Sequence, residues 1–237
     1  NSLINNEVDD LIDFIYYQVH NNCKVNLGKP SFNLNKLIVN EIAEKQGLKI
    51  PAFKIAKNNS QIASFKEGKS GLISKAISNG VYNTIENNRF YSYTELIEDE
   101  LLNTNEEVKF FPSLIMEKID KKSEIRTFFI DGHFFSMVIF SQSSNQTKVD
   151  FRKYNSQEPN KTEPYCLPKS IEDKLEKLFN KLRLNCGSID LIIDTNGDYI
   201  FLEINPVGQY GMVSSPCNYN LDKKIAKYLT DGLFKED

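Results

Sequence analysis

Two apolar runs separated by an Asn-Gly pair constrain the fold of this chain more than any other feature of its sequence. The first run covers residues 188–194 and the second covers residues 199–205. Asn196-Gly197 is a preferred sequence for a two-residue type I′ turn between antiparallel strands. The pattern therefore predicts a β-hairpin over residues 188–205, and a turn of known length sets how its strands pair.

The predicted turn sets the register of this hairpin. It pairs Asp190 with Glu203, Ile192 with Phe201, and Leu191 with Leu202. Alternation along the strands then predicts a core-facing set made of Ile189, Leu191, Ile193, Ile200, Leu202 and Ile204. The opposite face carries both carboxylates, with Asn205 beside Glu203, and is predicted to be the functional face.

Two carboxylates that face each other in a sheet repel, and the neighbouring sequence offers no cation to offset this repulsion. A bound divalent cation would resolve the conflict. Asp190, Glu203 and Asn205 supply hard oxygen ligands that suit Mg²⁺, which commonly brings substrate phosphates with it. The hairpin therefore predicts a magnesium site, the alternative being the solvated outer face of an ordinary hairpin.

The other patterns predict an α+β chain. Apolar residues at helical spacing predict helices over residues 7–20, 33–47 and 171–182, a short helix within 58–70 and a strongly acidic helix over 94–102. Strands are predicted at 52–57 and 71–77, with a second hairpin over 125–140. This order lacks the alternation of strands and helices that a Rossmann sheet requires.

Charge and composition exclude several classes of protein. The 237 residues include 29 Lys and Arg against 32 Asp and Glu, a net charge of -3 that leaves no excess of cations for a nucleic-acid backbone. No apolar run approaches the roughly 18 residues that span a bilayer, so we expect no membrane partner. The first residues show neither the basic nor the apolar part of a signal peptide.

The cysteines and histidines also narrow the chemistry. Cys23, Cys166, Cys186 and Cys217 lie far apart in sequence, which favours reduced thiols in a cytoplasmic protein over disulfides or a zinc site. His20 and His133 have no second imidazole nearby in sequence. Chemistry by lysine, arginine and carboxylate side chains is what remains.

Several segments resemble, in order along the chain, the motifs of ATP-grasp ligases. The hairpin with Asp190, Glu203 and Asn205 resembles the metal-binding strands of that family. Asn35-Lys36, followed by an apolar helix, resembles the segment that carries the first phosphate-binding lysine. Residues 71–77 resemble the strand with the second such lysine. The resemblance therefore implies that Lys36 and Lys75 contact ATP phosphates.

The middle of the chain resembles the adenine-binding hinge of the same family. In residues 111–119 the resemblance implies that the backbone of Glu117 and Ile119 and the side chain of Lys118 contact the base. Glu124 stands where the family often has a ribose-binding carboxylate. Arg126 lies two residues further on, and it either forms a salt bridge with Glu124 or contacts substrate.

A further cation is expected near residue 150. The family commonly has a phosphate-contacting cation there, for which Arg152 is the first choice and Lys153 the second. In one respect the chain departs from the family. Many amino-acid and peptide ligases of the family have an arginine just before the metal-binding aspartate, where this chain has Ser188-Ile189. Arg126 or Arg152 is then expected to steady an acyl phosphate in catalysis.

Residues 185–226 resemble one branch of the ATP-grasp ligases, the graspetide (ω-ester-containing peptide) synthetases. Among these synthetases, they resemble the grasp-with-spasm type of peptide maturase. The resemblance covers about residues 32–229. It implies an ATP-grasp fold in which two α+β lobes grip ATP, with the N-terminal lobe of the family largely absent. The expected parts are a helical remnant or linker at 1–31, a central lobe with its lead-in helix at 32–116, and a C-terminal lobe with the metal-binding hairpin at 117–237.

This resemblance implies a macrocyclase that uses ATP and Mg²⁺. It would phosphorylate an Asp or Glu side chain of a ribosomal precursor peptide, and a Ser, Thr or Lys side chain of that peptide would displace the phosphate to close an ester or amide ring. Family members tend to engage the leader of the peptide near the acidic segment that contains Glu98 and near the hairpin after Glu124.

Two other functions stay open at this point. One is an ATP-grasp ligase that adds an amino acid to a protein or a small carboxylic acid. The other is a nucleotide-binding module without ligase activity. The sequence also leaves a homodimer open.

Overall fold

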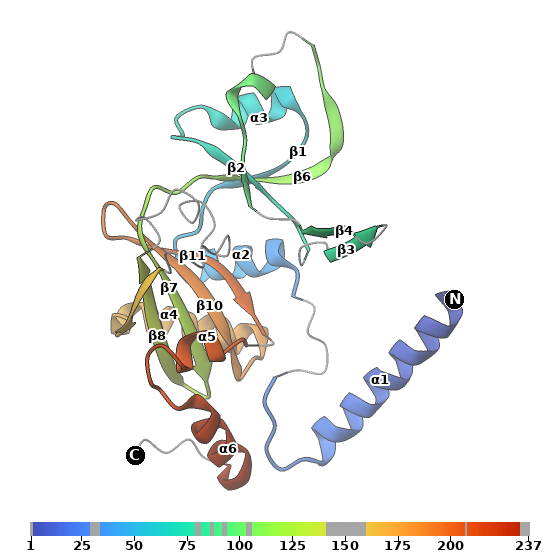
Figure 1. The fold of residues 1–237 in the computed structure, drawn as a ribbon, viewed down its shortest axis with the longest axis vertical. Helices are drawn as coiled ribbons and strands as arrows, with labels where there is room; N and C mark the ends of the chain where they lie inside the picture. Colours follow the sequence, from blue (N-terminus) through green and yellow to red (C-terminus); the bar gives the residue numbers. More distant parts are fainter. Residues whose placement is uncertain are drawn as a thin grey trace.

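Two antiparallel sheets form the two halves of the protein, one above the other in Figure 1. The computed structural model describes residues 2–28, 34–78, 82–85, 88–91, 94–102, 106–140, 160–206 and 208–232. The upper sheet has four strands in the order β1-β6-β2-β5, and the lower sheet has five in the order β11-β10-β7-β8-β9. The predicted α+β class is therefore confirmed.

The elements have the following bounds. The upper sheet contains β1 (Phe53–Asn58), β2 (Leu72–Lys75), β5 (Glu95–Leu96) and β6 (Lys109–Glu117), and a two-stranded ribbon is made of β3 (Tyr82–Ile85) and β4 (Asn88–Tyr91). The lower sheet contains β7 (Lys121–Ile130), β8 (His133–Phe140), β9 (Lys161–Tyr165), β10 (Cys186–Asp194) and β11 (Tyr199–Asn205). The helices are α1 (Ser2–Asn22), α2 (Lys36–Lys45), α3 (Asn59–Lys66), α4 (Lys169–Leu182), α5 (Gly211–Ser214) and α6 (Leu221–Asp231), with a 3₁₀ turn at Asp99–Leu101.

The main core lies on one face of the lower sheet, under α2 and α4. The apolar residues of α4 recur at helical spacing, and Leu175, Leu178 and Phe179 are fully buried against the sheet. Each such side chain contributes roughly 1.5–3 kcal/mol by leaving water. Helix α2 begins after Asn35, whose side-chain oxygen accepts a hydrogen bond from the Leu37 N–H at 3.0 Å. The helix expected to lead into the upper half therefore packs on the lower sheet.

The second face of the lower sheet is covered only in part. Helices α5 and α6 cover one end of it, where Phe128 and Ile130 pack against Leu221, and Met137 packs against Val213. The other end faces the upper sheet. The polar side chains on this end of the sheet are thus held between the two halves of the protein.

Most of the predicted elements form. The helices expected over 7–20, 33–47 and 171–182, the short helix within 58–70, the two strands near 52–57 and 71–77 and the hairpin turned at Asp131-Gly132 are all confirmed, with shifted ends. The acidic helix predicted over 94–102 is wrong. There Glu95 and Leu96 pair with β2, and the Ile97 N–H donates to the Leu72 carbonyl at 3.0 Å. The open edge of β2 offers hydrogen bonds to this backbone, whereas a helix would bring like charges together at i,i+3 and i,i+4.

The hairpin of β10 and β11 forms, but only part of its predicted register is correct. Asp190 lies opposite Glu203, as predicted. Leu191, however, lies opposite Phe201 and not Leu202, because the pairing shifts by one residue between Asp190 and Leu191. Ile192 accordingly lies opposite Ile200 and not Phe201.

Two departures from an ideal hairpin cancel each other. The tip is a three-residue loop closed by a hydrogen bond from the Asp194 N–H to the Asp198 carbonyl at 3.0 Å, and Gly197 has a φ of 86° there. A β-bulge at Leu202 then adds one residue to β11 and restores the register at Glu203. As a result Phe201 packs in the core, and Leu202 lines the cleft described below, on the same side as Glu203.

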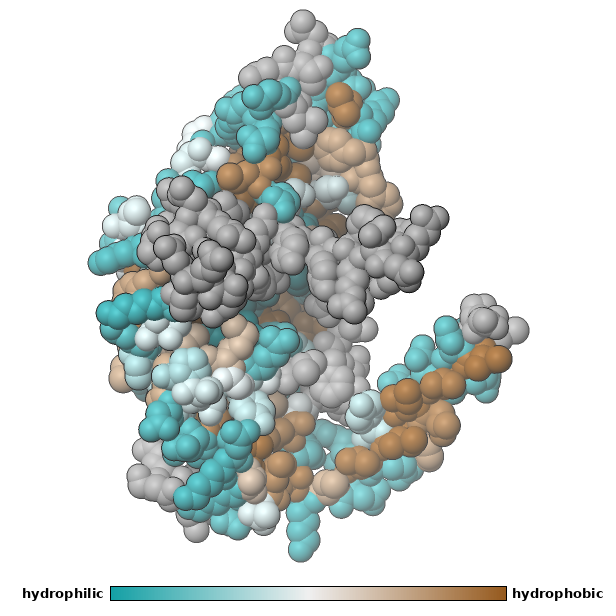
Figure 2. Space-filling model, in the orientation of Figure 1, coloured by the Kyte–Doolittle hydropathy of each residue, from teal (hydrophilic) through white to brown (hydrophobic). Residues whose placement is uncertain are grey.

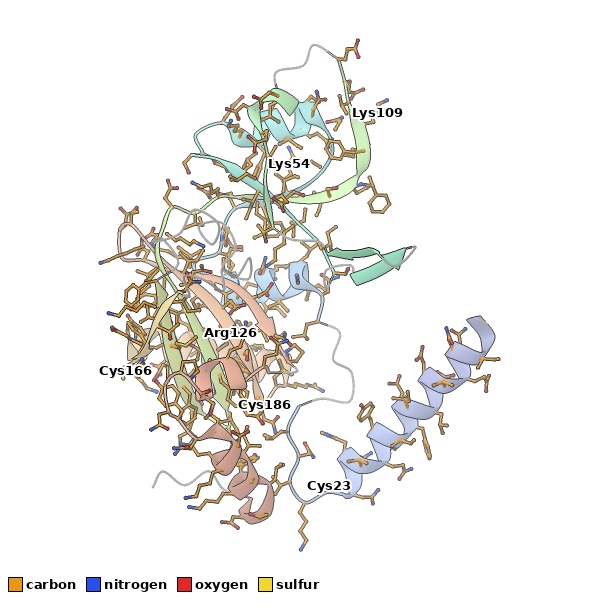
Figure 3. The ribbon with its side chains drawn as sticks, viewed as in Figure 1. Cys23, Lys54, Lys109, Arg126, Cys166 and Cys186 are labelled. Atoms are coloured by element: carbon orange, nitrogen blue, oxygen red, sulfur yellow. The ribbon has the colours of Figure 1, made fainter. Side chains whose placement is uncertain are left out.

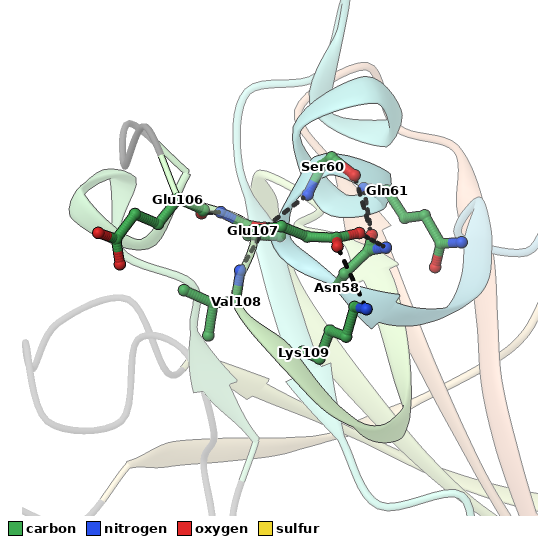
Figure 4. A network of polar contacts seen from close by, with 8 residues as sticks. Asn58, Ser60, Gln61, Glu106, Glu107, Val108 and Lys109 are labelled. Carbon is green, nitrogen blue, oxygen red and sulfur yellow. Dashed lines mark hydrogen bonds and ion pairs between the residues drawn. The ribbon is translucent and has the colours of Figure 1, made fainter.

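Polar contacts attach the start of β6 to α3 in the upper half (Figure 4). The Asn58 side chain caps α3 by accepting from the Gln61 N–H, and its amide donates to Glu107 Oε1 at 2.8 Å. The Asn59 side chain accepts from the Val108 N–H at 3.0 Å. Two adjacent asparagines thus satisfy backbone groups in both elements, which anchors the end of the upper sheet.

Helix α1 stands apart from the two sheets in Figure 1, and Figure 2 shows an apolar stripe along it. Ile4, Leu11 and Ile15 are each more than half exposed. Although α1 has 21 residues, neither it nor any other described helix meets the length and hydropathy that crossing a bilayer requires.

The cysteines are free thiols in two environments (Figure 3). Cys23 and Cys166 are exposed, and Cys186 and Cys217 are buried. Burial raises the pKa of the Cys186 thiol to about 11, against a weaker lowering by the backbone of Gly28. The two buried thiols therefore remain protonated and unreactive at neutral pH.

The bulge can be tested by comparing Phe201→Ala with Leu202→Ala. Phe201 is fully buried and Leu202 is half-buried in the cleft, so Phe201→Ala should cost about 3–5 kcal/mol of unfolding free energy and Leu202→Ala much less. Urea denaturation of both variants measures this difference. An uninterrupted two-residue hairpin gives the reverse order, and that result would contradict the bulge.

Candidate active site

A cleft lies where the upper sheet meets the uncovered end of the lower sheet. Strands of both sheets line it, through Pro51, Ile73, Lys75, Thr94, Met116, Glu117, Ile119, Lys121, Glu124, Asp190, Ile192, Leu202 and Glu203. The predicted functional face of the hairpin is therefore one wall of the cleft.

Cations from distant parts of the chain offset the charge of the opposed carboxylates. Lys75 Nζ lies 2.6 Å from Glu203 Oε2, and Lys36 Nζ lies 3.6 Å from the same oxygen. Arg126 Nη1 donates to both oxygens of Asp190, at 2.5 and 2.6 Å. The neighbouring sequence offers no cation, as expected, but cations 64 or more residues away in sequence offset the repulsion once folding brings them near.

The contact between Lys75 and Glu203 also joins the two halves of the protein. Lys75 ends β2 of the upper sheet, and Glu203 lies in β11 of the lower sheet. Both side chains are largely shielded, with 17% and 20% of their surface exposed. Lys36 reaches the same carboxylate from the first turn of α2. Glu203 is thus the point where three elements of the chain meet.

Arg126 lies inside the lower sheet, under the cleft (Figure 3). It is opposite Asp190 in the pairing of β7 with β10, and only 5% of it is exposed. Burial raises the pKa of Asp190, the Arg126 guanidinium lowers it in part, and Glu203 raises it further. Arg126 therefore pairs with Asp190. The alternative of a salt bridge between Arg126 and Glu124 is wrong.

Glu124 has a different partner, which the sequence analysis missed. Lys121 Nζ donates to Glu124 Oε1 at 2.7 Å, and both side chains are over 90% buried while lining the cleft. The three-residue separation of the pair on one strand gave no reason to expect this contact, since odd separations place side chains on opposite faces of a regular strand. A register shift near the start of β7, between Ile193 and Asp194 of its partner, accompanies it.

The hinge residues lie where the chain passes from β6 into β7. The Glu117 N–H donates to the Ala52 carbonyl at 2.8 Å, and the Lys118 N–H donates to the Gly71 carbonyl at 2.9 Å. Glu117 and Ile119 line the cleft. The Lys118 side chain does not line it: its Nζ pairs with Asp120 at 2.5 Å. The expected contact from the Lys118 side chain to a ligand would require that ion pair to break.

Three predicted residues remain to be placed. Asn205 lies opposite Ser188, two residue pairs beyond the pair of Asp190 with Glu203, and is not among the residues that line the cleft. Arg152 and Lys153 fall outside the described residues. Of the predicted site, the fold pairs Lys36 and Lys75 with Glu203, and Arg126 with Asp190, on adjacent strands. Glu117, Ile119 and Glu124 line the same cleft as the two carboxylates.

The oxygen ligands of this cleft are few but of a suitable kind for magnesium. In the described part of the chain, no group of three or more His, Cys, Asp or Glu side chains is arranged to hold a metal ion. Asp190 and Glu203 nevertheless place two carboxylates side by side on adjacent strands. Mg²⁺ is commonly held by one or two protein carboxylates together with waters and substrate phosphates. The residues present therefore fit a magnesium ion that binds with a nucleotide.

Two α+β halves with a cleft lined by lysines and carboxylates between them are typical of the ATP-grasp class of fold. The family model of the RimK-like ATP-grasp domain matches residues 33–229, so the chain belongs to that family. The ATP-grasp fold and the ATP-dependent ligase class that the sequence resemblance implied are thereby confirmed. A comparison with curated protein sequences gives no match.

Solved structures of peptide-modifying ligases are similar to this chain. One is a Chryseobacterium gregarium RiPP-associated ATP-grasp ligase in complex with ADP and a leader and core peptide, with 25% identity, a TM-score of 0.78, and coverage of 98% of this chain and 68% of that one. Another is macrocyclase MdnC from Microcystis aeruginosa MRC bound with precursor peptide MdnA, with 28% identity, a TM-score of 0.67, and coverage of 84% and 61%. ATP-grasp ligase PsnB, with a phosphomimetic precursor variant, Mg and ADP, shares the fold at 16% identity and a TM-score of 0.75, with coverage of 95% and 67%. The chain thus spans between 61% and 68% of the length of these ligases.

The pairing of Arg126 with Asp190 can be tested by a double-mutant cycle. Arg126→Met leaves a buried carboxylate without its cation and should cost about 3–5 kcal/mol of unfolding free energy. Adding Asp190→Asn should recover part of that loss, with a coupling energy of about 0.5–3 kcal/mol in denaturant titrations. Lys161→Met, which removes an exposed pair with Glu163, is the control and should change stability little. Additive effects at Arg126 and Asp190 would contradict the pairing.

Proposed function

We propose that this protein is an ATP-dependent peptide macrocyclase. It phosphorylates Asp or Glu side chains of a ribosomal precursor peptide and joins them to Ser or Thr hydroxyls, or to a Lys amine, of the same peptide. The observation that carries the proposal is the contact of Lys36 and Lys75 with the carboxylate of Glu203, beside Asp190. Similarity to ligases solved with leader, core and precursor peptides supports the peptide substrate.

The cleft supports specific roles in nucleotide binding. The backbone of Glu117 and Ile119 would hold adenine where β6 passes into β7, and Glu124 would bind the ribose after exchanging its contact with Lys121. Lys118 would join them by leaving Asp120. Lys36 and Lys75 would contact phosphates, since each places an ammonium group at the wall of the cleft.

Asp190, Glu203 and Asn205 would hold Mg²⁺ with the nucleotide. When bound, this ion neutralises charge on the phosphate oxygens during phosphoryl transfer. Asp190 is kept in place by Arg126, and Glu203 is positioned by the bulge at Leu202. Asn205 has the weakest support of the three, because it lies beyond the lining of the cleft.

Catalysis then depends on positioned cations and on no protein nucleophile. A peptide carboxylate attacks the terminal phosphate, and ADP leaves. A hydroxyl or amine of the same peptide next attacks the acyl carbon, and phosphate leaves. Arg126 and Arg152 are the cations proposed for catalysis: Arg152 would steady the acyl phosphate, and Arg126, which does not line the cleft, would act by holding Asp190 in place. Binding both reacting groups on one peptide supplies proximity.

The acidic segment that contains Glu98 is a proposed docking surface for the leader of the precursor. Glu95, Glu98 and Glu100 are exposed at the edge of the upper sheet, while Asp99 pairs with Lys66. A leader with basic residues would complement this edge.

Mass spectrometry separates the proposed activity from its two alternatives. The protein is incubated with ATP, Mg²⁺ and a precursor peptide encoded next to its gene. We expect a loss of one water from the peptide for each ring that closes. A gain in mass would favour the ligase that adds an amino acid, and an unchanged peptide with nucleotide bound would favour the non-catalytic module. Either result would contradict the macrocyclase.

The contact between the lysines and Glu203 predicts an effect of opposite sign on two kinds of nucleotide binding. Without Mg²⁺, Glu203 competes with the phosphates of the nucleotide for Lys75 and Lys36. Glu203→Gln should therefore raise the affinity for metal-free ADP by about 5-fold, which is the lower end of the effect that one binding event typically has on another. With Mg²⁺, the same variant should bind ADP more weakly than wild type because a metal ligand is lost.

Isothermal titration calorimetry in EDTA and in Mg²⁺ measures both effects. Glu163→Gln is the matched control, since Glu163 lies on the edge strand β9 and pairs with the exposed Lys161. Its affinities should equal those of wild type. Weaker metal-free binding by Glu203→Gln would show that the lysines do not meet the phosphates, and would contradict the assigned roles.

A further inference from the structure

Two buried polar atoms on the cleft side of the lower sheet have no hydrogen-bond partner. They are Arg126 Nε and Ser188 Oγ, and no other buried side-chain nitrogen or oxygen of the described residues shares this condition. Arg126 is 5% exposed, and Ser188 is fully buried. Leaving such a group without a partner costs about 1–3 kcal/mol, so each of the two requires an explanation.

Other buried hydroxyls of this sheet region are paired within the protein. Thr127 and Ser136, on the opposite face, share a hydrogen bond of 2.7 Å. Ser214 Oγ accepts from the Leu221 N–H at 2.9 Å. The fold thus satisfies hydroxyl groups where it can, which distinguishes Ser188 from its neighbours.

The two residues that carry these atoms are diagonal neighbours on one face of the sheet. Arg126 pairs with Asp190 across β7 and β10, and Ser188 precedes Asp190 by two residues on the same face of β10. Diagonal neighbours on one face of a sheet are close enough for long side chains to meet. Neither residue lines the cleft, so a substrate group in the cleft does not contact them in this arrangement. A partner for both atoms must be small.

We propose that Arg126 Nε and Ser188 Oγ hold one internal water molecule behind Asp190. The water accepts the Nε–H of Arg126 and exchanges a hydrogen bond with the Ser188 hydroxyl, and buried waters typically make two to four such bonds. Ser188 thereby becomes a positioning residue that acts through Arg126.

The water accounts for the way in which Arg126 holds Asp190. Arginine usually grips a carboxylate with two nitrogens in a fork. Here a single nitrogen, Nη1, contacts both oxygens of Asp190, and Nε makes no hydrogen bond within the protein. If Nε joined the grip, Arg126 would occupy more of the lone pairs of Asp190. Ser188 and the water therefore keep Asp190 available to a metal ion.

The effect of Ser188 on metal binding rests on the proposed role of Asp190 as a magnesium ligand. The water site itself does not depend on that role. Ser188→Thr retains the hydroxyl. Ser188→Val has the same shape as the threonine variant but carries a methyl group in place of the hydroxyl, so any steric clash from the added bulk is the same in both variants. Ser188→Ala removes the hydroxyl without added bulk. Ser136→Ala removes a buried hydroxyl from the opposite face and serves as the control.

The first readout is the Mg²⁺ concentration that gives half-maximal enhancement of ADP binding. We expect this midpoint to rise about 3- to 10-fold in Ser188→Val and Ser188→Ala, less than the 10- to 100-fold typical of a residue bonded directly to a metal ligand. Ser188→Thr and Ser136→Ala should remain near wild type. Equal midpoints for the Thr and Val variants, or for Ala and wild type, would overturn the positioning role.

The second readout is a high-resolution crystal structure of the ligand-free protein. We expect density for one water within hydrogen-bond distance of Arg126 Nε and Ser188 Oγ, and its loss in Ser188→Val. A direct bond between the two side chains, or no density between them, would overturn the water site. Magnesium dependence that survives Asp190→Asn would instead refute the proposed metal site, and the crystallographic result would still decide the water.

Discussion

The opposed carboxylates of Asp190 and Glu203 are the constraint on which the rest of the site depends. A sheet that places two acids side by side is destabilised unless cations or a metal ion compensate them. Here Arg126 compensates Asp190 from the adjacent strand, and Lys75 and Lys36 compensate Glu203 from two other elements. The same interaction therefore stabilises the hairpin, joins the two halves and gathers the cations of the cleft.

This arrangement connects stability with the proposed function. In the ligand-free protein each acid is paired with a base, which lowers the cost of placing charges in a shielded cleft. In the proposed function, a nucleotide with magnesium would bring both charge types at once, negative phosphates for the lysines and a cation for the carboxylates. This exchange of partners would replace one set of charge pairs by another without leaving a buried charge uncompensated.

The fold of the lower half explains why the acids lie where they do. Phe201 and Ile189 pack in the main core, while Asp190, Leu202 and Glu203 lie on the cleft side. The bulge at Leu202 allows two consecutive residues of β11 to share that side. Helices α5 and α6 cover the rest of this face, so that only its polar end meets the upper sheet.

The sequence by itself determined the local features, which are the hairpins and the amphipathic helices, since apolar periodicity and turn residues act over short range. It predicted the pairing of Asp190 with Glu203 only because the three-residue loop and the bulge at Leu202 offset each other. It also supported the family through motifs that contain Lys36 and Lys75. Only the tertiary structure decided which cation meets which acid, the bulge at Leu202, and the strand at Glu95 that replaced an expected helix. Those features depend on partners far away in the chain, and a hydrogen bond or ion pair over such a separation leaves no local pattern in the sequence.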